Sequence, residues 1–391
     1  MEKPIRQFIK GSFIICLVYM AGYLIAPIEV RYISSLTSNP TLIGATYAIG
    51  ALFFALLSVW LGRQSDRFGR NRFIVLGCVL GIVYPLLYAS TYNVFQYMGV
   101  KFIWAFSAVA TSPIFMAYLQ DILKHIKNKG HYIGMLYAVQ SILGALSHLI
   151  GGYLSDRFGL SAPYFAMSII FLLATVIAIR EIGLKPTSKP KTTEKKRSIL
   201  FGLRYILKKP ELKFYFVQNT AFNINWGIKI MLWPLIIFSM AQSDIITGSI
   251  FATMGIAAFF ILLFSGKLVD RLGPFIPAQI SMFILGLSGI FLAFTGNIYI
   301  FWLFAAIYAI GEAIHGPAQG VILTEHIESK YRGELLGLDA VFDNIFAMIS
   351  PFAAGLLLNF WEPQSILLIY ISLFWISLAI CHIIYKTRIN N

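Results

Sequence analysis

Stretches of about twenty predominantly apolar residues, the length needed for one helical membrane crossing, follow one another along almost the whole chain. Only segments that satisfy every backbone hydrogen bond internally can cross a bilayer. Of the 391 residues, 58% are hydrophobic and 12% are charged, which is about half the charge of an ordinary soluble domain. A soluble protein would need polar helix faces that these stretches lack. The pattern therefore predicts an all-α membrane protein that crosses the bilayer many times.

The apolar stretches divide into twelve expected membrane spans. Short polar turns separate them, with one long connection in the middle of the chain. The spans are predicted at residues 11–34, 39–62, 73–93, 97–120, 131–155, 162–181, 212–240, 246–267, 275–295, 299–324, 333–359 and 364–385.

Basic residues are distributed unevenly between the two sides of these spans. An even number of crossings places both termini on the same side. If that side is the cytoplasm, the inner loops and tails hold all but four of the 31 lysine and arginine residues, the exceptions being Arg31, Lys101, Arg157 and Lys229. An excess of Lys and Arg in the inner loops is the usual mark of orientation. We therefore predict a multi-pass protein of the plasma membrane with cytoplasmic N- and C-termini.

The net charge of +14 does not indicate a nucleic-acid partner, because the basic residues lie in short loops and do not line one soluble face. Cys16, Cys78 and Cys381 all fall inside apolar stretches and give neither a disulfide framework nor metal-ligand spacing. We find no nucleophile–base pair, no HExxH sequence and no phosphate-binding glycine loop. We therefore expect no metal, no cofactor and no enzymatic activity. The expected state is a monomer in a lipid bilayer.

The long connection at residues 182–211 separates residues 1–181 from residues 212–391, which we expect to form two six-helix bundles. Its first part is rich in Pro, Thr and Lys, which is typical of a flexible linker. Its second part, SILFGLRYILKK, places apolar residues at helical spacing among basic ones. This favours a short amphipathic helix on the inner membrane surface over an early start of the seventh span.

The two halves share sequence landmarks in the same order. GRQSDRFGR at 62–70 matches GKLVDRLGP at 266–274. SHLIGG at 147–152 matches SPFAAG at 350–355. Because each half has an even number of spans, the halves are expected to be parallel copies related by an axis along the membrane normal. A further near-copy, GGYLSDRFG at 151–159, falls at an expected outer turn, and we interpret it as a helix end with a glycine stop and no gating role.

The stretch between the second and third spans resembles the GxxxDRxGR motif of the major facilitator superfamily of transporters. The twelve spans, the central linker and the weaker second copy extend this resemblance over the whole chain. The resemblance implies that the turn holds the two bundles together on the cytoplasmic side. Asp66 would face the start of a helix in the other half, and Arg67 and Arg70 would bind acidic partners such as Asp121. The implied gate residues are Gly62, Asp66, Arg67, Gly69, Arg70, Asp121, Asp270 and Arg271.

The physical chemistry of this stretch suits a latch. Glycines permit close packing and a sharp turn, and a carboxylate near a helix N-terminus gains about 0.3–1 kcal/mol. The alternative is that the charges only fix the topology. The sequence departs from the family pattern at Gln64 and Asn71, and Pro274 replaces the last arginine of the second copy. Ser147 and His148 stand where the drug–proton antiporters of the family have Gly-Pro, which weakens the case for a drug antiporter specifically.

Few charged residues lie inside the expected spans, where a central charge costs about 2.5–3.5 kcal/mol and therefore faces water or a partner. Glu312, Asp343 and Asp339 are the candidate proton-coupling residues. We expect Lys229, Glu312 and Asp343 to form one charged group lining a central cavity. Burial favours the neutral form of a carboxyl group and a nearby ammonium favours the charged form, so such a group could load and release a proton. A permanent Lys–acid pair, or an anionic substrate bound by Lys229, are the alternatives.

Aromatic, amide and basic groups inside the spans suit a small-molecule pocket. Glu29 and Arg31 are instead interpreted as an outer gate or an interfacial pair.

We predict a secondary active transporter, an antiporter that works by alternating access, coupled to a proton or another ion, with efflux favoured on family frequency. Uptake or facilitated transport of a sugar or organic anion, and a non-transporting receptor or sensor, are the alternatives. The substrate-cavity candidates are Lys229, Asn223, Trp226, Lys101 and Gln140.

Overall fold

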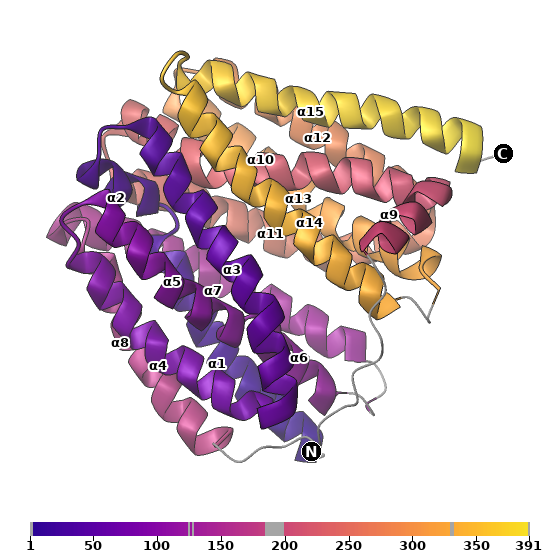
Figure 1. The fold of residues 1–391 in the computed structure, drawn as a ribbon. Coiled ribbons are helices and arrows are strands. Elements are labelled where there is room, and N and C mark those ends of the chain that lie inside the picture. Colours follow the sequence, from indigo (N-terminus) through magenta and orange to yellow (C-terminus); the bar gives the residue numbers. More distant parts are fainter. Residues whose placement is uncertain (1–2, 124–125, 127–128, 184–198, 329–331, 390–391) are drawn as a thin grey trace. The chain divides into compact units, whose positions relative to one another are not determined.

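The regular elements in the described part of the chain are helices (Figure 1). A computed structural model describes all residues except 1–2, 124–125, 127–128, 184–198, 329–331 and 390–391. Within the described residues, eleven helical segments are long and apolar enough to cross a membrane. The expected span at 333–359 contains a shorter apolar helix, Phe342–Leu357. The prediction of an all-α membrane protein is confirmed.

Contacts divide the chain into two compact units. Unit 1 comprises Met1–Thr193 together with Ser243–Ala252, and unit 2 comprises Glu194–Gln242 together with Thr253–Asn391. The first division falls within the expected linker. The other division cuts a single continuous helix, α11 (Asp244–Leu272), whose beginning belongs to unit 1 and whose remainder belongs to unit 2. The sequence predicts instead that the whole of this helix belongs to the C-terminal bundle, 212–391.

Proline and polar caps set several helix boundaries in unit 1. Pro27 lies between α1 and α2, where the first expected span is broken, and Pro113 begins α6 directly after α5. The Asn39 side chain accepts a hydrogen bond from the Thr41 backbone N–H at 2.9 Å and so caps α3. Helix α1 packs on α7 and α8, while α4 packs on α5 and α8. The helices of unit 1, besides the start of α11, are α1 (Lys3–Ile25), α2 (Glu29–Leu36), α3 (Pro40–Phe68), α4 (Arg70–Ala89), α5 (Val94–Thr111), α6 (Pro113–Ile122), α7 (Lys129–Phe158) and α8 (Ala162–Glu181).

Unit 2 repeats the order of these pairings. Helix α10 packs on α14 and α15, as α1 packs on α7 and α8 in unit 1. Helix α12 packs on α13 and α15, as α4 packs on α5 and α8. Helix α9 corresponds to the amphipathic segment of the linker, and its position on a membrane surface stays a prediction. Besides the remainder of α11, unit 2 contains α9 (Ile199–Lys208), α10 (Pro210–Ala241), α12 (Phe275–Phe294), α13 (Ile298–His326), α14 (Arg332–Leu357), α15 (Pro363–Ile384) and a terminal π-helical turn, Tyr385–Ile389.

Three helices end on the same local signature. Helices α3 and α7 end in Asp-Arg-Phe and α11 ends in Asp-Arg-Leu, and a glycine follows each time. A side chain would strain the backbone there, because the φ angle is positive: 92° at Gly69, 91° at Gly159 and 70° at Gly273. The glycine stop predicted for the stretch at 151–159 is confirmed.

Candidate functional site

Lys229 of α10 and Glu312 of α13 form an ion pair inside unit 2. The lysine is only 8% exposed. Its ammonium lies 5.9 Å from the ring centroid of Trp233 and 5.7 Å from that of Tyr308. An unpaired charge is costly in such surroundings, and the carboxylate of Glu312 supplies the compensating charge. The pair therefore ties two adjacent helices of unit 2 together.

The two aspartates of α14 are held by neutral donors from α10. The Asn219 and Asn223 Nδ2 atoms donate to Asp343 Oδ1 at 2.6 and 2.7 Å. One turn earlier on α14, Asp339 Oδ2 accepts from the Tyr215 hydroxyl at 2.7 Å. Among the described residues, no basic side chain forms an ion pair with either aspartate. These two carboxylates thus lack the cationic partner that Glu312 has.

The polar residues of α10 form two clusters and not the single charged group expected from the sequence. Asn219 and Asn223 are four residues apart and share one helix face, which is directed at α14. Lys229 follows six residues later, about 9 Å further along the helix and on a different face. It contacts α13 there. The structure therefore brings Lys229 and Glu312 together and places Asp343 with Asp339.

The other cavity candidates have varied surroundings. The Asn223 side chain donates a hydrogen bond to Asp343 and another, at 2.9 Å, to the Asn219 carbonyl. Trp226 is 43% exposed. Gln140 of α7 is buried, and its Nε2 atom has no hydrogen-bond partner in the described part of the chain. Contact of these residues with a substrate stays a prediction.

Lys101, a candidate for the substrate cavity, lies enclosed within unit 1. It is 3% exposed, and its ammonium is 2.6 Å from Glu29 Oε1. The Tyr97 hydroxyl donates to the same oxygen at 2.9 Å. Four aromatic rings surround the ammonium at centroid distances of 4.9 to 5.7 Å: Tyr47, Tyr88, Tyr97 and Trp104.

Glu29 and Arg31, interpreted from the sequence as an outer gate or an interfacial pair, bind different partners, and a gating role stays a prediction. Glu29 binds Lys101, whereas Arg31 binds Asp244 with an Nη1–Oδ1 distance of 2.5 Å. Both residues lie in α2, where positions two apart point away from each other. Sequence reasoning missed Glu29 as the partner of Lys101 and did not single out Asp244. The signal for Asp244 was present as a Ser-Asp pair directly before an apolar stretch, which is typical of a helix start.

The motif between α3 and α4 forms a charged network at one end of unit 1. Arg70 Nη2 lies 3.0 Å from Asp66 Oδ1, and Arg70 Nη1 lies 2.7 Å from Asp121 Oδ2. The Arg67 guanidinium instead lies 5.7 Å from the ring centroid of Phe68. Asn71, where the family pattern has a basic residue, donates to the Ile182 carbonyl at 3.0 Å and so caps the end of α8.

A small hollow of about 150 Å³ lies beside this network in unit 1, lined in part by Gly62, Asp66 and Arg70. A Cβ atom built on Gly62 would meet nothing within 4 Å, so the close packing expected at this glycine is not seen within unit 1. In the second copy of the motif, Asp270 and Arg271 lie exposed in the last turn of α11.

The model of the Major Facilitator Superfamily matches residues 11–296 and again residues 214–388. The chain belongs to this superfamily. It is a secondary transporter of the MFS type, a multi-pass membrane protein and not an enzyme, as the sequence predicts. Proteins of this superfamily bind small-molecule substrates.

Relatives match nearly the full length of this MFS transporter. An uncharacterized MFS-type transporter of Methanocaldococcus jannaschii is 27% identical over 89% of this chain and 91% of the relative. Multidrug resistance protein 2 of Bacillus subtilis is 22% identical over 92% and 91%. The proton-coupled antiporter flippase LtaA of Staphylococcus saprophyticus is 24% identical over 80% and 79%. The crystal structure of the nucleoside transporter NupG has a TM-score of 0.78 at 13% identity, covers 98% of this chain and 100% of that chain, and shows the shared fold.

Proposed function

We propose that this MFS transporter couples the movement of a small molecule to a proton that binds at Asp343, with Asp339 as its neighbour. One observation carries the proposal: the two carboxylates lie one helical turn apart on α14 and receive hydrogen bonds only from neutral groups, as far as the described residues extend. Glu312, the third candidate, already has Lys229 as a partner. The proton-binding role therefore falls first on Asp343.

Electrostatics explains why a proton would respond to the state of the transporter at this place. Carboxylates at positions i and i+4 of a helix repel each other, and binding one proton removes that repulsion. A charged carboxylate also needs water or strong donors, which the apolar interior supplies poorly. When water reaches Asp343 the charged form is solvated, and when the site closes the protonated form is favoured. Alternating access would thus load and release the proton on different sides.

The ion pair of Lys229 and Glu312 gives little support to an anionic substrate at Lys229. The ammonium is already neutralised by a carboxylate within its own unit and flanked by two aromatic rings. An anion would have to displace Glu312 or require its protonation. Proton coupling at Asp343 needs neither step, and it is therefore the function that this geometry favours over organic-anion binding.

Direction and orientation complete the proposal. Relatives named as a multidrug resistance protein and as a proton-coupled antiporter support antiport in the efflux direction. Uptake or facilitated transport of a sugar or organic anion is the alternative within the same fold. The distribution of Lys and Arg supports an orientation with both termini in the cytoplasm, and a monomer in the plasma membrane is part of the same proposal.

The test uses purified protein in liposomes with an imposed pH gradient and ethidium as the fluorescent probe. Asp343→Asn keeps the size and the hydrogen-bonding capacity of the side chain but cannot exchange a proton. We expect gradient-driven ethidium transport to fall at least tenfold, while exchange of ethidium at equal pH on both sides falls less than threefold. The control is Glu362→Gln, which removes an exposed carboxylate just before α15 and should change neither rate.

Full gradient-driven transport by Asp343→Asn, and by the double variant with Asp339→Asn, would refute proton coupling at α14. Loss of both gradient-driven transport and equal-pH exchange would refute a role limited to the proton, since the carboxylate would then be needed for movement of the probe itself. A wild-type protein that moves ethidium equally well without a gradient would refute coupling altogether.

We further propose that the motif network of α3 and α4 acts as the cytoplasmic latch. Asp66 borders a hollow in unit 1, and its carboxylate is about half exposed, so it is available to the start of another helix. Arg70 holds Asp66 in place. We expect Asp66→Asn to slow transport at least fivefold. Asp121→Asn, which removes the other carboxylate of Arg70 but keeps that of Asp66, should slow transport less than twofold, and equal effects of the two substitutions would contradict the latch.

A further inference from the structure

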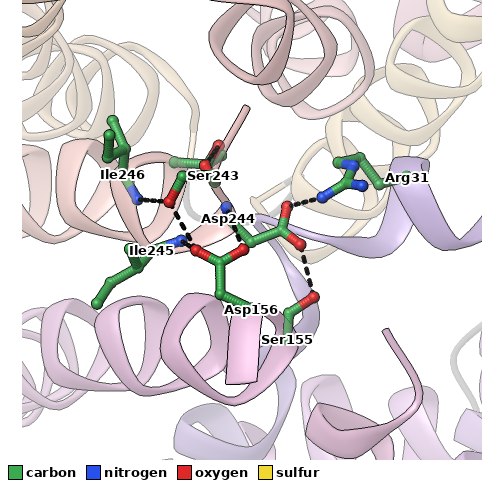
Figure 2. A network of polar contacts seen from close by, with 8 residues as sticks. Arg31, Ser155, Asp156, Ser243, Asp244, Ile245 and Ile246 are labelled. Atoms are coloured by element: carbon green, nitrogen blue, oxygen red, sulfur yellow. Dashed lines mark hydrogen bonds and ion pairs between the residues drawn. The ribbon is translucent and has the colours of Figure 1, made fainter. Parts of the chain in front are cut away.

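The end of α7 supplies a cap for the beginning of α11, within unit 1 (Figure 2). Asp156 Oδ1 accepts from the Asp244 backbone N–H at 2.8 Å, and Oδ2 accepts from the Ile245 N–H at 2.9 Å. The Ser243 hydroxyl donates to Oδ2 at 2.6 Å. The first N–H groups of a helix have no partner within it and carry partial positive charge, so a carboxylate binds them well. One side chain of α7 therefore caps a helix that lies far away in the sequence.

Asp244 makes the reciprocal connection. Its Oδ2 atom accepts from the Ser155 hydroxyl of α7 at 2.6 Å, and its Oδ1 atom pairs with Arg31 of α2 at 2.5 Å. Asp244 is buried, whereas Asp156 is exposed. In Figure 2 the two carboxylates lie side by side, each directed at a different set of donors. The first turn of α11 is thus held to both α7 and α2.

Glycines bring the backbones of α7 and α11 into direct contact below this network. A Cβ atom built on Gly152 would overlap the Asp244 carbonyl, and one built on Gly248 would overlap the His148 carbonyl. Such a seam contains no interlocking side chains on the glycine faces. Small residues let helix backbones approach closely, so few bulky side chains would have to repack if these two helices moved apart. The contact is therefore close but not interlocked.

The capping residue belongs to a sequence that unit 1 uses twice. SDRFG occurs at the end of α3 and again at the end of α7. Asp121, which contacts the first copy through Arg70, precedes α7, and Asp156 lies near its other end. The distance along α7 from Lys129 to Asp156 is about 40 Å at 1.5 Å per residue. The two copies therefore lie at opposite ends of unit 1, one beside a hollow and one occupied by a helix start.

We propose that Asp156, Ser155, Arg31, Ser243 and Asp244 form a clasp, the α11 clasp, that opens and closes once in each transport cycle. It is the counterpart, at the other end of unit 1, of the latch at Asp66. This inference rests on the proposed alternating-access function. Helix α11 begins in unit 1 and continues into unit 2, and alternating access requires the two bundles to rock about a central site. A clasp that never opened would hold the start of α11 on unit 1 throughout the cycle.

The composition of the clasp suits repeated opening. Its bonds are directed at charged acceptors, which makes them strong for their number. The exposed carboxylate of Asp156 can exchange the helix start for water, so opening does not leave that charge without donors. Opening separates Asp244 from Arg31 and exposes both charges to water, which can then solvate them. The helix end at Gly159 agrees with the glycine stop expected from the sequence, whereas the capping of α11 by Asp156 was not expected, and the proposed clasp gives this stretch the gating role that the sequence did not indicate.

The test measures one distance in the substrate-free protein in liposomes. Spin labels are attached to Leu160→Cys, after α7, and Ile246→Cys, in the first turn of α11, in a background in which the three buried native cysteines are replaced by serine. We expect a short-distance and a long-distance population in the otherwise unchanged protein. Asp156→Asn and, separately, Arg31→Gln should raise the ratio of long to short at least fivefold.

Two variants serve as controls. Arg157→Gln changes a charge at the exposed neighbour of Asp156 and should leave the ratio within twofold of its starting value. The exchanged pair Arg31→Asp with Asp244→Arg restores opposite charges and should bring the ratio back at least halfway from the Arg31→Gln value. Each variant is first checked for monodispersity in detergent, and the exchanged pair provides the test if a single variant does not fold.

A single unchanged distance in the starting protein and in both single variants would overturn the clasp. So would an equal shift with Arg157→Gln, since the effect would then follow from charge alone. These outcomes require no substrate and no proton gradient. A moving clasp together with full gradient-driven transport by Asp343→Asn would refute the proposed coupling and leave the clasp intact. If the spin-label distance does not change and Asp343→Asn loses gradient-driven transport, the clasp is refuted and the proposed coupling stands.

Discussion

Each unit contains a buried lysine–glutamate pair flanked by aromatic rings, and the two pairs differ in what surrounds them. In unit 1, Lys101 and Glu29 are matched one to one and enclosed by four rings, and Tyr97 also donates to the carboxylate. In unit 2, Lys229 and Glu312 have two ring neighbours, and α10 also holds two further carboxylates on α14 through neutral donors.

The difference teaches that a buried ion pair is not in itself a sign of coupling. The pair in unit 1 is electrically balanced, because the one ammonium of Lys101 faces the one carboxylate of Glu29. In unit 2, Asp339 and Asp343 add two carboxylates beside α10 that have no basic partner among the described residues, so this part of the unit carries a local excess of negative charge. We therefore interpret the Lys101–Glu29 pair as a purely structural contact. We interpret the Lys229–Glu312 pair as part of a region whose net charge changes when a proton binds. Four single substitutions test this interpretation.

The largest effect on stability is expected from Glu29→Gln. The substitution leaves the Lys101 ammonium buried among aromatic rings without a negative partner, and breaking a buried pair in this way costs about 3–5 kcal/mol. Thermal unfolding in detergent measures the loss, with Glu362→Gln as the control. The double variant Glu29→Gln with Lys101→Met should recover at least half of the stability. A loss below about 1 kcal/mol, the usual value of an exposed pair, would show that the unit 1 pair does not have this structural role.

An intermediate effect is expected from Lys229→Gln. Glu312 is left without its cation, but it is more exposed than Lys101 and can be relieved by taking up a proton. We expect a loss of about 1–3 kcal/mol in unfolding free energy, the range for leaving a buried polar group unsatisfied. The same thermal unfolding assay applies, and Glu312→Gln added to Lys229→Gln should restore stability. A cost equal to or above that of Glu29→Gln would erase the distinction between the two pairs.

The smallest effect on stability, and the most selective, is expected from matched tyrosine substitutions. Tyr215→Phe removes the donor to Asp339, and Tyr97→Phe removes one of two donors to Glu29. Each should cost about 0.5–1.5 kcal/mol. Only Tyr215→Phe should alter gradient-driven ethidium transport, by about threefold, because only Asp339 neighbours the proposed proton site. Equal transport effects of the two variants would place proton sensitivity in both units or in neither.

Local features of this fold were predictable from the sequence, because they depend on neighbouring residues. The apolar stretches give the helices, Pro27 breaks the first span, and the glycine after each Asp-Arg signature ends a helix. The family resemblance also gave the fold class. The contact of Arg70 with Asp121 was foreseen from the motif, whereas a contact of Arg67 with Asp121 is not seen and the contact of Arg70 with Asp66 was not predicted.

Pairings between helices were less predictable, because they depend on how each helix is rotated about its axis. Glu29 and Arg31 are two residues apart and yet bind partners on α5 and α11. The sequence offered Glu312 and Asp343 as possible acidic partners of Lys229. Lys229 pairs with Glu312 because Lys229 lies on the face of α10 that is directed at α13. The capping of α11 by Asp156 joins the ends of two distant helices, and spacing along the chain carries no information about such a contact.

The membership of Ser243–Ala252 in unit 1 means that the duplicated halves of the sequence are not interchangeable building blocks. A gene fragment that stops in the linker would encode the first repeat but omit the residues that cover Gly152 and occupy Asp156. Two co-expressed fragments separated in the linker would consequently be held together by the start of α11, which the second fragment would donate to the first. In a transporter split in the linker, residues 243–252 would thus help the two fragments to associate. If the chain were cut after residue 252 instead, these residues would stay on the first fragment and could not link it to the second.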